Sequence, residues 1–241
     1  MNKTIIKAKL KRAWATAVLN FKNLKIAYII PAGILGALIV NMIIFFAIPS
    51  GGDNSGIENN VFYGVALLAA ILIPSRNFKK NITLNIKKKD FFFGAAMNYA
   101  ILSFAVSLVT LLLFYFAAQP VTNAGMGYDM TFLALYRAFG WSAHNPAVGF
   151  LQQFGFLFFW CVLIHTLVGL QDKWIGWVID CVIVAAIPIF SVLQATGTLR
   201  IWSFIFYPII FGHPAAQILF TVIGGAALYC LNLLILKKKN I

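Results

Sequence analysis

The residues with the most suggestive types and spacing form a basic segment in which apolar side chains recur. The segment between Arg76 and Phe91 holds six lysines or arginines before a single aspartate. Its candidate contact residues are Phe78, Lys79, Lys80, Ile82, Leu84, Ile86, Lys87, Lys88 and Asp90. A short helix here could present Phe78, Ile82 and Ile86 on one face at four-residue spacing. The pattern predicts a docking surface for a partner protein, and the alternative is a solvated basic loop at lipid head groups.

Side chains capable of catalysis are few and scattered. Glu58 is the only glutamate, and the histidines at 144, 165 and 213 are far apart in the sequence. Neither the H-E-x-x-H zinc motif nor the G-x-x-x-x-G-K-[ST] phosphate-binding loop occurs. We therefore expect no catalytic, cofactor-binding or metal-binding residue in this chain, and no enzymatic activity. His165 lies in an apolar run, where packing or hydrogen bonding competes with a proton-relay or haem role.

Asp180 is an acidic residue placed inside a long apolar run. It follows Trp174 by six residues, which is about 9 Å along a helix. A carboxylate at the centre of a membrane helix costs roughly 2.5–3.5 kcal/mol, so Asp180 should face protein or water. Two roles remain open: a structural ion pair or hydrogen bond at a helix junction, or a part in substrate passage or conformational transmission.

The composition indicates an integral membrane protein. Of 241 residues, 61% are hydrophobic and 10% are charged, whereas a soluble domain carries roughly 25% charged residues. A bilayer accepts only helices or closed barrels, and the apolar runs lack the alternation of barrel strands. The net charge of +13 raises the question of nucleic acid. Its placement on one side of the membrane explains it instead, so we expect no nucleic-acid partner.

Six apolar runs predict six transmembrane helices, at about 26–48, 59–78, 91–118, 147–170, 174–194 and 215–236. With this division, 17 of the 19 lysines and arginines fall on the side of the N-terminus, in residues 1–25, 76–89, 173 and 237–239. Only Arg137 and Arg200 fall on the other side. Because basic residues stay on the cytoplasmic side, we expect both termini to be cytoplasmic.

Two further segments should lie at the membrane without crossing it. Residues 1–25 predict an amphipathic interfacial helix, with lysines off its apolar stripe; a disordered basic tail is the alternative. The stripe consists of Ile6, Leu10, Trp14, Ala17, Phe21 and Leu24. Residues 199–211 are apolar but too short to span, which favours a re-entrant segment before the last helix. The expected organisation is therefore the helix 1–25 followed by a six-helix membrane domain, 26–241.

This arrangement resembles a known family. The six spans, the N-terminal helix, the basic loop running into Phe91-Phe92-Phe93-Gly94 and the re-entrant segment are similar to permease subunits of ABC exporters. The similar branch contains O-antigen exporters and ABCG-type pumps. The stretch 81–94 is similar to that family's coupling segment, although it lacks the acidic residue that precedes it there. The small size and aromatic richness also resemble the permeases that export phenol-soluble modulins, which are peptide toxins.

The resemblance implies a mechanism and a set of partners. Two permease chains, identical or related, would pair in a bacterial plasma membrane, and each would sit on one ATPase subunit that binds ATP and magnesium. The segment from Phe78 to Asp90 would act as a coupling helix docked on the ATPase. The expected substrate is a hydrophobic or amphipathic peptide, toxin, drug or lipid-linked molecule. The alternatives are a secondary transporter, an intramembrane enzyme, and a non-transporting assembly or immunity protein.

Overall fold

The computed structural model describes residues 3–25, 35–36, 39, 60–116, 136, 139–171, 176–178, 181 and 213–238. Within these ranges the chain forms helices and no strand. The elements are α1 (Lys3–Asn23), α3 (Asn60–Leu72), η1 (Ile73–Asn77), α4 (Phe78–Thr83), α5 (Lys88–Phe116), η3 (Trp141–Ala143), α7 (Pro146–Leu170) and α10 (Pro214–Lys238). Nearly all of the predicted spans 26–48 and 174–194, together with Asp180 and the segment 199–211, lies outside the described residues.

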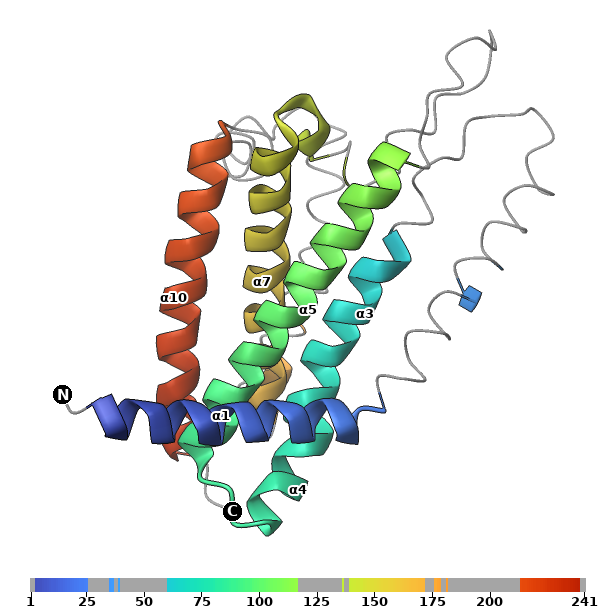
Figure 1. Cartoon of the computed structure of the whole chain (residues 1–241). Coiled ribbons are helices and arrows are strands. Elements are labelled where there is room, and N and C mark those ends of the chain that lie inside the picture. Colours follow the sequence, from blue (N-terminus) through green and yellow to red (C-terminus); the bar gives the residue numbers. More distant parts are fainter. Residues whose placement is uncertain are drawn as a thin grey trace, which may run out of the picture.

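Among the described residues, three helices are long and apolar enough to cross a membrane. These spans are Lys88–Leu112, Pro146–Leu170 and Pro214–Leu234, and they agree with the predicted spans 91–118, 147–170 and 215–236. Figure 1 shows the axes of α5, α7 and α10 roughly aligned, with α5 tilted and α3 beside it. The all-helical fold class is therefore confirmed for the described residues, and a total of six spans stays a prediction.

Large apolar side chains lie on the outward faces of these helices as well as in the core. Large apolar residues such as Ile101, Phe104 and Leu108 of α5 point outward, whereas Ser103 and Ser107 of the same helix are completely buried. Outward apolar side chains are stable where the surroundings are lipid rather than water. Buried polar side chains in turn join membrane helices to one another. This pattern supports a bilayer as the medium of the bundle.

The predicted span 59–78 begins as a regular helix and then changes its winding. After the 13 residues of α3, residues Ile73–Asn77 form a π-helical turn that leads directly into α4. Pro74 lies in this turn and has no N–H to donate to the preceding turn. Ser75 lies beside it and donates from Oγ to the carbonyl of Ile71 at 2.7 Å. Single π-turns inside α-helices are rare and are frequent at functional sites.

Helix α4 ends at Thr83 in a Schellman motif. The N–H of Ile86 donates to the carbonyl of Asn81 at 3.1 Å, and the N–H of Asn85 donates to Ile82 at 2.9 Å. The motif requires a left-handed residue after the helix, and Asn85 supplies it with φ of 58°. This cap turns the chain sharply from α4 toward the first turn of α5.

Helix α1 crosses one end of the bundle, where α4 also lies (Figure 1). A helix is present at Lys3–Asn23, within the predicted range 1–25. Its interfacial position stays a prediction, and its predicted stripe is divided between two faces. Ile6, Leu10 and Trp14 are exposed, whereas Ala17 and Leu24 are buried against the protein. The buried face also contains Ala13, Thr16 and Asn20. The small residues on the buried face allow α1 to approach α5 closely. The bulky residues Ile6, Leu10 and Trp14 lie on the other face and remain available for lipid.

Candidate functional site

Buried asparagines attach α1 to the π-turn and to α4. Asn81 of α4 donates from Nδ2 to the side-chain oxygen of Asn20 at 2.7 Å. Asn77 of the π-turn donates to the backbone carbonyl of Asn20 at 3.3 Å. All three side chains are at most 1% exposed. Because Asn77 and Asn81 are four residues apart, the winding of this segment places both amides toward α1. We call these three residues the asparagine clamp.

A second set of contacts attaches α1 to α5. Asn98 donates to the carbonyl of Ala17 at 3.2 Å, and a Cβ placed on Gly94 would lie 2.9 Å from the Cβ of Thr16. Arg12 reaches Asp90 at 3.9 Å, with Arg12 half exposed. An exposed pair of this kind stabilises little, so the buried asparagines and the close approach at Gly94 hold the helices together. As a result, α1, α4 and the first turns of α5 form one packed unit.

The predicted docking residues are not all on one exposed face. Phe78 is 3% exposed and packs edge-on against Phe91, with ring centroids 5.1 Å apart. Ile82 and Ile86 are half-buried against the core, and Ile86 lies beyond the end of α4. Leu84 instead is 55% exposed, in the turn after the helix. The expected face of Phe78, Ile82 and Ile86 therefore points mainly inward, because α4 is packed against its own chain.

Several basic residues of the segment are exposed, as Leu84 is. Lys79, Lys80 and Lys87 are exposed, and Lys80 donates to the side-chain oxygen of Asn23 at 2.7 Å. Lys88 and Asp90 are partly buried at the start of α5. An aspartate in the first turn of a helix also interacts favourably with the helix dipole. Of the predicted docking residues, the exposed ones are thus Leu84, Lys79, Lys80 and Lys87.

A second polar feature runs along the interface of α5 with α7 and α3. At one end Tyr99 shares a hydrogen bond of 2.5 Å with Nδ1 of His165. At the other end Gln153 donates to the hydroxyl of Tyr63 at 2.7 Å and also to Thr110. Between them Ser103 of α5 faces the thiol of Cys161. We call this row the polar seam; its members are Tyr63, Tyr99, Ser103, Ser107, Thr110, Gln153, Cys161 and His165.

The seam follows from the antiparallel packing of two helices. On α7, residues 153, 157, 161 and 165 are spaced four apart and so lie in a row on one face. That face lies against α5, with residue 153 near Thr110 and residue 165 near Tyr99. Leu157 is the apolar member of that row and is 1% exposed. From Tyr99 to Thr110 the seam extends about 16 Å at 1.5 Å per residue. The paired role of His165 with Tyr99 agrees with the hydrogen-bonding interpretation of this histidine.

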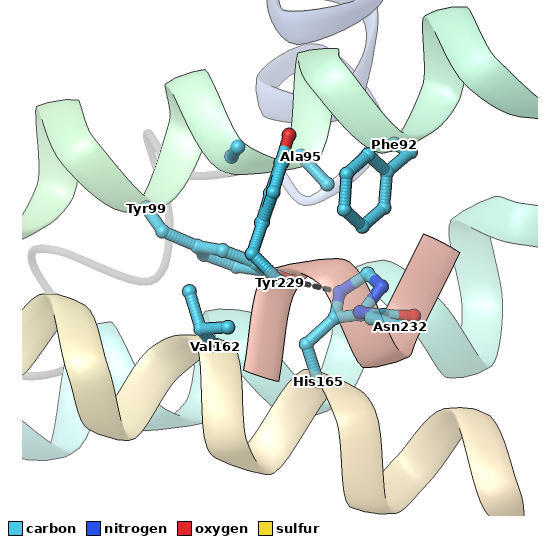
Figure 2. A pocket seen from close by; sticks show the side chains of 8 residues that line it. Phe92, Ala95, Tyr99, Val162, His165, Tyr229 and Asn232 are labelled. Carbon is cyan, nitrogen blue, oxygen red and sulfur yellow. Dashed lines mark hydrogen bonds between the residues drawn. The ribbon is translucent and has the colours of Figure 1, made fainter. Parts of the chain in front are cut away.

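A small cavity adjoins the seam beside His165. It lies among α5, α7 and α10 and has a volume of about 10 Å³. Figure 2 shows Phe92 and Tyr99 of α5, His165 of α7, and Tyr229 and Asn232 of α10 around it. Phe92 and Tyr229 have ring centroids 3.9 Å apart and bridge α5 and α10 there. The space is large enough for about one water molecule.

The opposite end of the seam is covered by an aromatic cluster. Trp141 of η3 is 1% exposed and lies near Tyr63, with ring centroids 6.4 Å apart. Tyr136 packs on Phe114 at 4.6 Å, and burial raises the pKa of the Tyr136 hydroxyl above its usual value. Gly140 adopts a left-handed φ of 70° just before η3, which lets the chain turn so that Trp141 points inward. This cluster separates the seam from that end of the bundle.

Within the described ranges, no group of three histidine, cysteine or acidic residues could hold a metal ion. No protein-family model matches the chain, and neither a curated protein nor a solved structure matches it. The asparagine clamp and the polar seam were both missed by the sequence analysis. The four-residue spacing of Asn77 and Asn81 was the available signal for the first.

Proposed function

We propose that this chain is the membrane-spanning permease subunit of an ATP-driven exporter whose ATPase is a separate subunit. The proposed complex has two permeases, each with six spans and cytoplasmic termini, and two ATPases. The proposed substrate is hydrophobic or amphipathic, as the family resemblance implies. Three helices of spanning length and outward-facing apolar side chains support the membrane location.

The observation that carries the proposal is the surface formed by Leu84. This leucine is 55% exposed at the end of the bundle, and Lys79, Lys80 and Lys87 of the same segment are also exposed. Protein interfaces commonly combine an apolar centre with a polar rim. We therefore assign this surface to the ATPase.

The asparagine clamp supports a role in transmission. A displacement of α4 changes the position of Asn81 and hence of Asn20 on α1. Helix α1 is in turn attached to α5 through Asn98 and Ala17. Nucleotide binding can shift the membrane helices only if the ATPase contacts differ between two states. A rigid unit of α1, α4 and α5 would carry that difference into the bundle.

The docking surface is tested by changing Leu84 while leaving the inner face of α4 intact. The variant Leu84→Asp should lose the ATPase on purification from native membranes, whereas Leu84→Met, the matched control, should retain it. The readout is the amount of nucleotide-binding subunit and the ATP hydrolysis that co-purify with equal amounts of permease. Full retention by Leu84→Asp would contradict the assignment.

A secondary transporter is the second candidate, because the buried Tyr99–His165 pair contains a titratable group inside a span. Ionisable residues within membrane helices frequently mark ion or proton pathways. The two functions differ in their energy source. In vesicles, an exporter requires ATP and its ATPase subunit, whereas a secondary transporter works from a proton gradient with this chain alone.

A further inference from the structure

The middle of the polar seam has hydrogen-bonding groups that the protein does not satisfy. Among the described residues, the hydroxyl of Ser107 and the side-chain oxygen of Gln153 have no hydrogen-bond partner, and the hydroxyl of Ser103 meets the thiol of Cys161, which is a weak hydrogen-bonding group. All three residues are 0% exposed. Buried polar groups in proteins are nearly always paired with protein or with ordered water. The seam is thus incomplete as a set of direct contacts between helices.

The unpaired atoms define the chemistry of what completes them. The oxygen of Gln153 can only accept a hydrogen bond, and each serine hydroxyl can donate one and accept two. No charged side chain belongs to the seam, so an ion brought there would lack a counter-charge. A small neutral molecule with O–H donors fits this set, and water is the smallest such molecule.

The structure also contains a place where water can enter. The cavity beside His165 adjoins the seam at Tyr99 and has the volume of about one water molecule. It lies toward the end of the bundle that α1 crosses, because its wall residues Phe92 and Ala95 flank Gly94, which contacts Thr16. The aromatic cluster around Trp141 covers the opposite end of the seam. Water would therefore enter from the α1 end.

We propose that the polar seam binds water at Ser103 and Ser107, and that this water is supplied through the cavity beside His165. Bound water connects the Tyr99–His165 pair to the Gln153–Tyr63 pair across the apolar position Leu157. It also allows α5 and α7 to separate without leaving bare polar groups in hydrocarbon. This inference concerns the chain itself and holds whether or not an ATPase partner is found.

The chain offers two cysteines that serve as internal probe and control. Cys161 lies in the seam and is buried, whereas Cys230 is exposed on the outer surface of α10, where lipid is expected. X-ray radiolysis of the protein in lipid nanodiscs generates hydroxyl radicals from water and oxidises the side chains beside it. If the seam is hydrated, Cys161 will be oxidised several-fold faster than Cys230 despite its burial. Oxidation of Cys161 at or below the rate of Cys230 would overturn the proposal.

A pair of variants tests the role of the serines. Ser107→Val replaces the hydroxyl with a methyl group and adds a second methyl, and it should reduce oxidation of Cys161 to near the Cys230 rate. Ala105→Val adds a similar side chain at an exposed position of α5 and should leave it unchanged. Rapid oxidation of Cys161 that persists in Ser107→Val would refute the assignment of bound water to this serine. Because the comparison of Cys161 with Cys230 uses the unaltered protein, the test does not depend on the variants folding.

Discussion

Removal of one amide from the asparagine clamp should loosen α1 from the rest of the protein. In Asn81→Ala the side-chain oxygen of Asn20 loses its 2.7 Å hydrogen bond and stays buried. An unpaired buried polar group costs about 1–3 kcal/mol. The Nδ2 of Asn20 already has no partner, so the variant leaves both polar atoms of this buried amide unpaired. We therefore expect Asn81→Ala to destabilise the folded protein by about that amount.

A double-mutant cycle separates this interaction from general disruption. Asn20→Leu should be as costly as Asn81→Leu, but the double variant should cost less than the sum, because two apolar side chains leave no unpaired amide. Residues in direct contact commonly show coupling energies of about 0.5–3 kcal/mol. Unfolding in mixed micelles gives the free energies, and hydrogen exchange of the α1 amides reports its release. The clamp would be refuted if the free-energy costs of the two single variants added up in the double variant, or if hydrogen exchange of the α1 amides did not change.

Three further predictions follow from other contacts and from the lysine distribution. Gly94→Ala should destabilise the protein, because the new Cβ would lie 2.9 Å from Thr16. The control Gly64→Ala has open space around it and should be neutral or stabilising by up to about 1 kcal/mol. Equal melting temperatures of the two variants would contradict this packing. Trp14→Asp on the exposed stripe of α1 should weaken binding of an α1 peptide to anionic vesicles, while Ala15→Ser, also exposed, should not; equal binding would argue against a lipid-facing stripe. Reporter fusions test the six-span topology, and any reversal among four sites would contradict it. The expected locations are outside after Ile57 and Asn123 and inside after Lys88 and Lys239.

The long membrane helices were predictable because length and apolarity determine them. The predicted bounds of the spans 91–118, 147–170 and 215–236 differ from the observed bounds of α5, α7 and α10 by at most three residues. The span 59–78 was harder, since a π-turn around Pro74 divides it. The predicted range 59–78 contains the 13-residue helix α3, the π-turn and the first residue of α4.

The clamp and the seam depend on pairings that a single helix does not reveal. Asn20, Asn77 and Asn81 look like surface residues in the sequence, and their burial follows only when α1 lies across α4. The inner face of α1 was misjudged for a related reason. Ala13 and Thr16 are too small or too polar to stand out in an apolar pattern, yet both are buried on the inner face of α1. Ser103 and Ser107 likewise gain meaning only once Cys161 and Gln153 are placed opposite them.

The most direct test of the proposed role is a photo-cross-link from position 84 in native membranes. Leu84 replaced by a photoreactive phenylalanine should give an adduct with a nucleotide-binding subunit, and ATP should change its yield. The same replacement at Leu108, on the outward face of α5, is the control and should give lipid adducts instead. Lipid adducts alone at position 84, with no nucleotide-binding subunit attached, would contradict the proposal that this chain is the permease of an ATP-driven exporter.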